Sequence, residues 1–416
     1  MPSIIKNVKG TKDILPQDSL NWDKLEQTLK KIAISYGFNE IRTPIFEKTE
    51  LFVRSVGEET DIVNKEMYTW EDLNGESLTL RPESTAPIIR SYIQNQLWKI
   101  EPLTKVFYID SLFRRERPQK GRQRQFHQFG VEAIGSAYPE QDAEIIAMAF
   151  YILNIFNIEN LRVEINSIGA LEDRNIFIKE LKKYLKPHLA KLSELSKKRF
   201  NTNALRILDS KSEKDIAIIK NAPSILDFIN KSDLDHFESV KKMLDAFAIP
   251  YIVSPSLVRG LDYYNKTTFE IKSDLLGSQN TICGGGRYDS LIQDLGGESI
   301  PAVGFAMGIE RLMLLSSNSN NNTQNADVYI INAEEQVITY SLSLATQLRN
   351  KLNLNVITES LRRSMKSQLR YANKINAKYV LIIGENEMKS NSVILKNMSS
   401  GSQKQVQIEK LSDEFK

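Results

Sequence analysis

Ten consecutive small polar residues at positions 316–325 constrain the fold of this 416-residue chain more than any other feature of its sequence. Such a run offers no apolar surface to bury, so we expect a flexible linker there and not part of a hydrophobic core. The residues before and after the run must therefore build separate cores. At roughly 150 residues per domain, the length predicts two to three domains.

The hydrophobic patterns on the two sides of this run differ. After it, strand-like and helix-like segments alternate over about 60 residues, which is typical of a small parallel α/β domain. Before it, residues 103–135 alternate with a period of two and predict an antiparallel hairpin, whereas residues 171–249 lose strand character. The predicted domains are a discontinuous core of residues 1–168 and 250–316, a helical insertion of residues 169–249, a linker of residues 317–326 and an α/β domain of residues 327–416.

Composition excludes several classes of protein. The shares of hydrophobic residues (41%) and charged residues (26%) are those of an ordinary globular protein. Because the net charge is only +3, any affinity for nucleic acid must come from local basic patches. The single cysteine, Cys283, excludes an internal disulfide and a thiolate-rich zinc site, and three scattered histidines argue against a histidine metal centre. Because no apolar run approaches the roughly 20 residues of a membrane span, and the N-terminus has no leader pattern, we expect a cytoplasmic protein with no membrane contact.

The most unusual segment is a basic stretch at residues 114–124, with six Arg or Lys residues and one Glu. A solvated basic loop is one explanation. The flanking strands are predicted to be half-buried, however, and side-chain parity places several polar or aromatic residues on common faces: Arg114 and Glu116 on the first strand, and Phe126, Gln128 and Glu132 on the second. Polar groups at such positions are costly unless they bind something. We therefore predict that this hairpin lines a pocket for a phosphorylated, partly aromatic ligand.

Four further segments could carry chemistry, and each also has a purely structural explanation: residues 80–86, 257–264, 283–289 and 301–311. The first contains Glu83 and Thr85 in what could be a simple turn, and the second places Arg259 beside a glycine. Three consecutive glycines in the third allow a ligand to approach closely or a bulge to form. The fourth enters a helix that carries Arg311. Since the sequence has neither a P-loop nor a Rossmann motif, arginines on a sheet would have to bind any nucleotide.

Taken in order, these segments closely resemble the histidyl-tRNA synthetase family of class II aminoacyl-tRNA synthetases. Residues 113–117 with 125–132 resemble class II motif 2, residues 304–311 resemble motif 3 and residues 42–44 resemble motif 1, while residues 257–264 and 284–289 resemble two peptides peculiar to the histidine enzymes. The resemblance implies an α+β catalytic domain built on an antiparallel sheet with a helical insertion, followed by an α/β domain that binds the anticodon.

The resemblance also implies an activity. A histidine–tRNA ligase joins L-histidine to ATP, accompanied by Mg²⁺, and then moves the histidyl group to the 3′ end of tRNA(His). The implied catalytic residues are Arg114 and Arg259. Those implied to bind ATP are Arg114, Glu116, Phe126 and Arg311. Those implied to bind histidine are Glu83, Thr85 and Gln128 at the ammonium group, and Glu132, Tyr263 and Tyr264 at the imidazole.

Further expectations concern partners. The residues implied to face tRNA are Arg117, Gln119, Lys120, Arg122 and Arg124. No metal site of protein ligands alone is expected, because Mg²⁺ would come with ATP. Motif 1 packs against a second subunit in the family, which implies a homodimer. Ser84 stands where relatives often have glycine, and Lys9 where an arginine is more usual.

Three alternatives were weighed against this interpretation. One is a catalytically inactive paralogue that serves as the regulatory subunit of ATP phosphoribosyltransferase, and another is a tRNA-sensing module. Such paralogues typically lose pocket arginines or the anticodon-binding domain, but Arg114, Arg259, Arg311 and residues 327–416 are all present here. The third, an α/β enzyme of unrelated chemistry, would need five motifs to occur in this order by coincidence.

Overall fold

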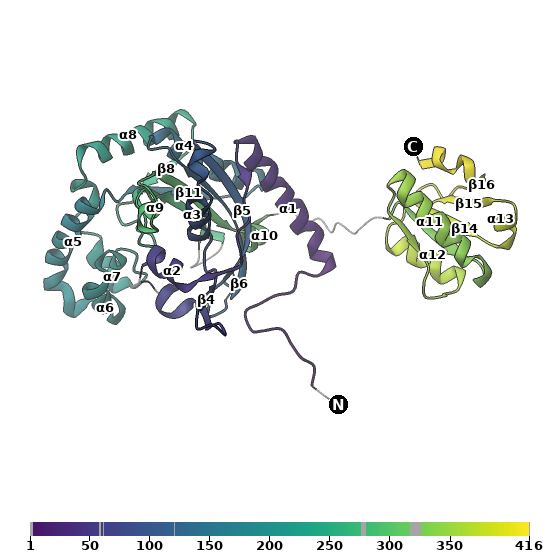
Figure 1. The fold of residues 1–416 in the computed structure, drawn as a ribbon, viewed down its shortest axis with the longest axis horizontal. Helices are drawn as coiled ribbons and strands as arrows, with labels where there is room; N and C mark the ends of the chain where they lie inside the picture. The colour runs from purple at the N-terminus through teal and green to yellow at the C-terminus, as the bar shows by residue number, and fades with distance from the viewer. Residues whose placement is uncertain are drawn as a thin grey trace. The chain divides into compact units, whose positions relative to one another are not determined.

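The computed structural model describes residues 3–57, 60, 62–119, 121–275, 280–316 and 326–415. The chain forms two compact units, the larger within residues 1–14 and 22–318 and the smaller within residues 15–21 and 319–416 (Figure 1). The linker predicted at residues 317–326 lies almost wholly outside the described residues, and so does Lys120.

The larger unit is built on an eight-stranded sheet in the order β1-β5-β6-β11-β10-β9-β7-β8. All pairs between β5 and β7 are antiparallel, and only the two edge pairs, β1 with β5 and β7 with β8, are parallel. The strands are β1 (Asn39–Glu40), β5 (Thr104–Phe113), β6 (Gln125–Ile134), β7 (Leu161–Ser167), β8 (Tyr251–Val253), β9 (Asn265–Ser273), β10 (Thr281–Arg287) and β11 (Ala302–Gly308). The predicted α+β domain on an antiparallel sheet is confirmed, as is the hairpin of β5 and β6.

Helices α1 (Pro16–Ser35), α4 (Pro139–Ile155) and α8 (Lys231–Ala246) cover one face of this sheet with apolar side chains. The odd-numbered residues Phe129 and Val131 of β6 belong to that core. Because successive side chains on a strand point to opposite faces, the even-numbered residues of β6 face the other side. The binary pattern of one strand thus separates the hydrophobic core from a polar surface.

Smaller elements surround the polar face. They are α2 (Thr49–Val56), α3 (Thr85–Gln94), α9 (Leu291–Asp294), α10 (Ile309–Leu315), the short helices η1 (Ile62–Glu66) and η2 (Leu97–Lys99), and a three-stranded sheet of β2 (Phe46–Lys48), β4 (Ser77–Leu80) and β3 (Tyr68–Glu71). Helix α3 begins two residues after Glu83, and α10 begins directly after β11, the strand that carries Gly304. Regular secondary structure therefore fixes the ends of both segments.

Between β7 and β8 the chain is helical. The elements are α5 (Leu171–Leu185), η3 (Lys186–Lys191), α6 (Glu194–Thr202), η4 (Ala204–Ile207), α7 (Glu213–Ile219), η5 (Ile225–Asp227) and α8. Phe177 and Leu181 of α5 pack with Ile207 and Ile225 in a cluster that also includes Tyr264. The last helix differs, because Phe237 and other residues of α8 pack into the core of the large sheet.

The smaller unit has a five-stranded sheet in the order β13-β12-β14-β15-β16. Its elements are β12 (Val328–Asn332), η7 (Glu335–Val337), α11 (Ile338–Leu352), β13 (Val356–Thr358), α12 (Met365–Lys374), β14 (Tyr379–Ile383), α13 (Glu385–Lys389), β15 (Ser392–Asn397), β16 (Gln403–Gln407) and η8 (Ile408–Phe415). The α/β class is confirmed, and the three strands of the stretch predicted to be parallel, β12, β13 and β14, do pair in parallel. The last two strands, which lie beyond that stretch, differ. β14, β15 and β16 pair antiparallel, because the connections between them are too short for a parallel crossover.

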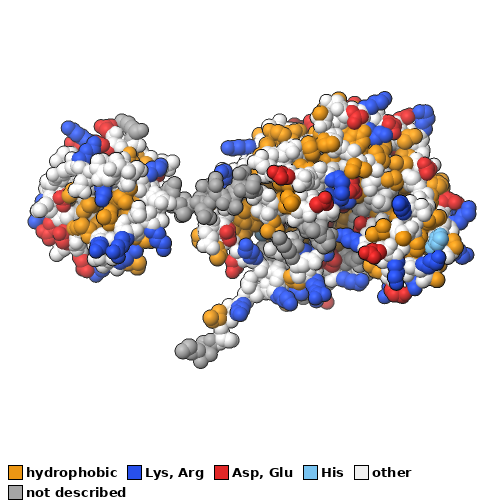
Figure 2. All heavy atoms as spheres, turned by 180° about the vertical axis from the view of Figure 1, so that it is seen from behind, with side chains coloured by type: hydrophobic (Ala, Val, Ile, Leu, Met, Phe, Trp, Pro, Cys, Tyr) orange, Lys and Arg blue, Asp and Glu red, His pale blue; other side chains and the backbone are white. Residues whose placement is uncertain are grey.

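The surface carries charges of both signs. On the face shown in Figure 2, basic and acidic side chains are interspersed, as the small net charge leads one to expect. Within the described ranges, no helix is both long and apolar enough to cross a membrane.

Candidate active site

A cavity of about 1210 Å³ lies at the polar face of the large sheet. Its lining includes seven of the predicted site residues: Arg114, Glu116, Arg122, Phe126, Gln128, Arg259 and Arg311. These come from segments nearly 200 positions apart in the sequence, and the antiparallel pairing of β5, β6, β11, β10 and β9 brings them to one place. The cavity also takes part of its wall from the helical segment, including Asn203 and Arg206.

Glycines on β10 and β11 make room for charged side chains. A Cβ atom on Gly284 would lie 2.4 Å from Nη1 of Arg259, and one on Gly304 would lie 1.9 Å from a carboxylate oxygen of Glu132. Gly304 is the direct partner of Glu132 in the pairing of β6 with β11. The glycines therefore have a steric role, in addition to the register shift that occurs after Gly286.

Arg259 is held from two sides. Its Nη1 forms an ion pair with Glu270 of β9, and its guanidinium lies 5.5 Å from the centre of the Tyr264 ring. Burial alone would lower the pKa of Arg259, but Tyr264 and Glu270 outweigh that effect and raise it. Arg259 is thus a fixed positive charge at the cavity wall.

Two further arginines are also fixed by neighbours. Nε of Arg114 donates to the carbonyl oxygen of Pro82 at 2.8 Å, and its guanidinium lies 5.3 Å from the centre of the Phe126 ring. Nε of Arg311 donates to the carbonyl of Gly121 at 3.2 Å, and Nη1 donates to the carbonyl of Thr281. Burial, together with the nearby Arg122 and Arg114, lowers the pKa of Arg311. Clustered cations of this kind are a site for an anion.

The other predicted histidine-binding residues lie behind this wall and do not line the cavity. Glu83, Thr85, Glu132, Tyr263 and Tyr264 are all buried. The Thr85 hydroxyl donates to Glu132 at 2.8 Å, and the two tyrosine rings lie 4.7 Å apart. Tyr264 connects them to the cavity through its contact with Arg259.

Two carboxyl groups in this cluster are perturbed. Burial raises the pKa of Glu132 to about 8, although hydrogen bonds from Tyr288 and Thr85 partly oppose the shift. Burial also raises the pKa of Glu83, whose oxygens accept from the backbone N–H groups of Thr85 (2.8 Å) and Ala86 (2.9 Å) at the start of α3. Perturbed carboxyl groups beside a cavity are a common property of functional sites.

Sequence reasoning missed four residues of this arrangement. Tyr288 donates its hydroxyl hydrogen to Glu132, and Glu270 pairs with Arg259. A signal existed for Glu270, because it is a charged residue between the buried Phe269 and Ile271 on a strand. The buried pair of Arg81 and Asp110, 2.9 Å apart, gave no such signal.

The residues predicted to face tRNA, as far as the structure describes them, do not form one common surface. Arg117 and Gln119 are exposed, and Lys120 lies outside the described residues. Arg122 instead pairs with Glu116 at 2.6 Å inside the cavity, and Arg124 donates its backbone N–H to the carbonyl of Gly10.

Cys283 and His127 have structural surroundings. Cys283 is buried in the core of the large sheet, and burial raises the pKa of its thiol. His127 contacts Trp22 edge-on and lies 2.8 Å from Glu310 through Nδ1. Among the residues that the structure describes, no three His, Cys, Asp or Glu side chains are arranged to hold a metal ion.

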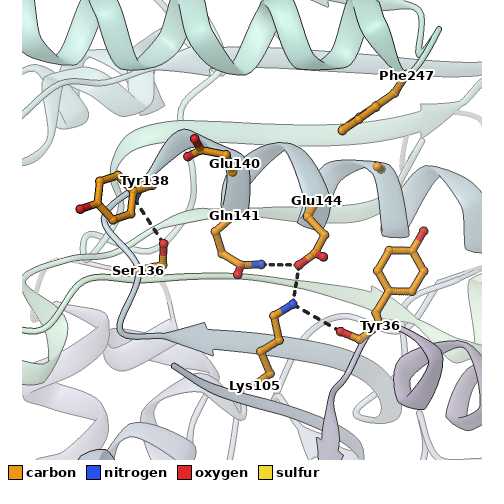
Figure 3. A pocket seen from close by; sticks show the side chains of 9 residues that line it. Tyr36, Lys105, Ser136, Tyr138, Glu140, Gln141, Glu144 and Phe247 are labelled. Atoms are coloured by element: carbon orange, nitrogen blue, oxygen red, sulfur yellow. Dashed lines mark hydrogen bonds and ion pairs between the residues drawn. The ribbon is translucent and has the colours of Figure 1, made fainter. Parts of the chain in front are cut away.

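A second cavity, of about 810 Å³, contains none of the predicted site residues. Figure 3 shows Lys105 pointing toward Glu144, at 2.6 Å, and toward the carbonyl of Tyr36, at 3.3 Å, with Tyr138 and Phe247 near the rim. Its one cation is thus already paired, and it offers no cluster of arginines for a phosphate.

Comparison with known proteins relates the chain to one family along its whole length. A family model described as histidyl-tRNA synthetase matches residues 10–312, and one described as an anticodon binding domain matches residues 327–416. Histidine–tRNA ligase of Protochlamydia amoebophila is 46% identical over 98% of both chains, and that of Thermoanaerobacter pseudethanolicus is 45% identical over 99% of both. The crystal structure of apo S. aureus histidyl-tRNA synthetase matches with a TM-score of 0.82 and 36% identity, covering 99% of this chain and 100% of the other.

Proposed function

This chain belongs to the histidyl-tRNA synthetase family, and from that premise we propose how its own residues perform the reaction of a histidine–tRNA ligase. Aminoacyl-tRNA synthetases use ATP as a substrate, and here the partners are histidine, ATP and tRNA. The observation that carries the assignment of roles is the convergence of Arg114, Arg259 and Arg311 on one cavity.

We propose that the arginines stabilise the charge that develops on ATP. When the histidine carboxylate attacks the α-phosphate, negative charge builds up on its oxygens, and guanidinium groups fixed beforehand lower the energy of that state. Arg114 and Arg259 flank the α-phosphate, and Arg311 binds the terminal phosphate. Glu116 and Phe126 bind the nucleoside part, with the aromatic ring stacking on adenine.

We propose that histidine is recognised by the buried cluster next to Arg259. Glu83, Thr85 and Gln128 bind its ammonium group, while Glu132, Tyr263 and Tyr264 bind the imidazole. A site whose buried polar groups need partners rejects amino acids that cannot supply them, with losses on the order of 10⁴–10⁵. The connected hydrogen bonds among Thr85, Glu132 and Tyr288 support this assignment, because they hold the acceptors in fixed positions.

Mg²⁺ is proposed to arrive with ATP. Three carboxylates of the cavity lining near the proposed phosphate-binding arginines already have protein partners. Glu116 pairs with Arg122, Glu270 with Arg259 and Glu310 with His127. Phosphate oxygens and water would then supply most ligands. When bound, the ion neutralises charge on the triphosphate.

We further propose that the exposed Arg117 and Gln119 contact the tRNA acceptor stem, with Lys120, Arg122 and Arg124 contributing in the bound state, and that residues 327–416 contact the anticodon. The enzyme is proposed to act as a homodimer through the segment of residues 42–44, in the cytoplasm. Sedimentation of the full chain at micromolar concentration tests the dimer, and a purely monomeric species contradicts it.

The central experiment replaces Arg259. We expect Arg259→Ala to lower the rate of histidine-dependent ATP–pyrophosphate exchange by roughly 10²–10³, the scale of losing one preorganised charge partner. The fold should survive, because Glu270 keeps Lys272 at 3.4 Å and the Thr281 hydroxyl at 3.0 Å.

Arg162→Ala is the matched control. Arg162 lies on the same sheet and pairs with Glu164 at 3.0 Å, but it does not line the cavity. A near-normal exchange rate in Arg259→Ala removes Arg259 from the mechanism. No exchange with histidine in the unmodified protein would instead favour the regulatory paralogue.

A further inference from the structure

The two tyrosines proposed to bind histidine sit on a turn that is tied to α5 by one arginine. Nη1 of Arg174 donates hydrogen bonds to the carbonyl oxygens of Tyr264, at 3.0 Å, and Asp262, at 3.3 Å. Burial lowers the pKa of Arg174, and Asp262 partly offsets that effect. The Arg174 guanidinium is partly buried and donates to two backbone carbonyls. Its main effect is therefore to fix the backbone of residues 262–264.

The sequence around Arg174 explains why it reaches this turn. β7 ends at Ser167 and α5 begins at Leu171, and the connection needs Gly169, whose φ is +62° and where a Cβ would lie 2.7 Å from a methyl carbon of Ile229. Arg174 falls in the first turn of α5. Helical side chains lean toward the N-terminus, so its guanidinium lies at the β7–α5 junction.

The start of β9, which directly follows the two tyrosines, meets the same junction through its backbone. The N–H of Ile168 donates to the carbonyl of Lys266 at 2.9 Å, and the N–H of Lys266 donates to the carbonyl of Gly169 at 3.0 Å. Lys266 has a φ of +47°, a conformation that costs energy for a residue with a side chain. The backbone is thus strained two residues after Tyr264, and the two hydrogen bonds from Arg174 hold the preceding residues 262–264 in place.

We propose that Arg174 is a positioning residue for histidine binding. By fixing the backbone of residues 262–264, it sets the ring of Tyr264 under Arg259 and beside Tyr263. This proposal rests on the proposed roles of the two tyrosines in binding imidazole. It differs from them because Arg174 itself touches neither histidine nor ATP.

Arginine is needed at this position for its geometry. Lysine keeps the charge, but its single ammonium on a flexible stem does not reproduce the rigid fork of a guanidinium. A displacement of about 1 Å in a binding group is enough to cost a large factor in catalysis. We expect Arg174→Lys to raise the KM for histidine about tenfold, which corresponds to the loss of one hydrogen bond. The KM for ATP should change less than about twofold.

The test is pyrophosphate exchange by the full-length enzyme, with histidine varied at saturating ATP and ATP varied at saturating histidine. The readout is the ratio of the two KM values, which general destabilisation does not change selectively. Arg349→Lys is the matched control, because Nε and Nη2 of Arg349 also hold a backbone carbonyl, that of Val356, at 3.1 and 2.6 Å, in the smaller unit. Its ratio should equal that of the unmodified enzyme.

Two outcomes separate this proposal from the proposed function. An unchanged ratio in Arg174→Lys, or an equal rise of both KM values, overturns the positioning role. Tyr264→Phe tests the tyrosine directly, and if that variant leaves the KM for histidine unchanged, the role of Tyr264 fails first. If both single variants raise it, the double variant should raise it by less than the product of the two effects, and full additivity counts against a shared mechanism.

Discussion

At the scale of single residues, the chemistry of this site depends on which polar side chains the fold buries. Glu132 is buried between Thr85 and Tyr288, and burial raises its pKa to about 8. In the ligand-free protein, the group therefore holds a proton near neutral pH. This is the reverse of an ordinary surface carboxylate.

The raised pKa has a consequence for stability. A carboxyl group whose pKa is higher in the folded state than in the unfolded state favours folding most at low pH, and this contribution is lost as pH rises from about 4.5 to about 8. Glu132→Gln removes the titration. We therefore expect the variant's melting temperature, relative to the unmodified protein, to rise with pH across this window by at least about 3 °C.

Differential scanning fluorimetry at a series of pH values measures the effect. Glu180→Gln is the control, because Glu180 is an exposed residue paired with Lys183 on α5, and its difference should stay flat. A flat difference for Glu132→Gln as well contradicts the buried, protonated state.

At the scale of secondary structure elements, two adjacent glycines of β10 have different roles: one makes room for a side chain and the other for the backbone of a neighbouring strand. Gly284 faces Arg259, whereas Gly285 faces the neighbouring strand, where a Cβ would lie 2.2 Å from the carbonyl oxygen of Gly304. A flexible side chain can move away from a new methyl group, but backbone in the middle of a sheet cannot. Adjacent glycines should therefore respond differently to the same substitution.

We expect Gly284→Ala to lower histidine-dependent exchange by about 10- to 100-fold, because it displaces the Arg259 guanidinium that is proposed to be catalytic, with less than about 2 °C of change in melting temperature. Gly285→Ala should lower the melting temperature by several degrees, since overpacking against backbone costs about 1–3 kcal/mol. Melting curves and exchange rates of the two variants, measured side by side, check both. Equal loss of stability in the two variants would contradict the assignment.

The elements also show what sequence reasoning can reach. Alternation along residues 103–135 was enough to predict the hairpin of β5 and β6 and to place Phe126, Gln128 and Glu132 on one face of β6, because parity is a local property. Arg114 and Glu116, predicted on the first strand, lie just beyond its end at Phe113. Alternation could not predict that Glu270 pairs with Arg259 or that Tyr288 donates to Glu132, since those contacts depend on the register of β9, β10 and β11. In the smaller unit, the alternating pattern predicted the three parallel strands β12, β13 and β14 but did not reach β15 and β16, which pair antiparallel.

At the scale of the whole molecule, each unit has its own hydrophobic core. The clusters of the larger unit draw on residues up to Leu312, and those of the smaller unit begin at Ala326. All residues that line the candidate active site lie between Thr60 and Arg311. The described residues that are proposed to carry the adenylation chemistry therefore all lie in the larger unit.

A chain shortened to residues 1–316 should fold and keep histidine-dependent pyrophosphate exchange within about threefold. Its kcat/KM for charging tRNA should fall at least about 100-fold, because loss of roughly 3 kcal/mol of anticodon contact corresponds to that factor. Both activities are measured on the same preparation, with circular dichroism as the control for folding. Full charging by the shortened chain would remove residues 327–416 from tRNA binding.

The state of Cys283 has a practical consequence. The chain has no other cysteine, and this one is buried with a thiol that resists ionisation. Thiol-directed reagents react with the thiolate, so we expect Cys283 to stay unlabelled in the native protein. A fluorophore or spin probe attached at one introduced surface cysteine would report on that position alone, and the motions of either unit during tRNA charging could be followed without first removing a natural residue.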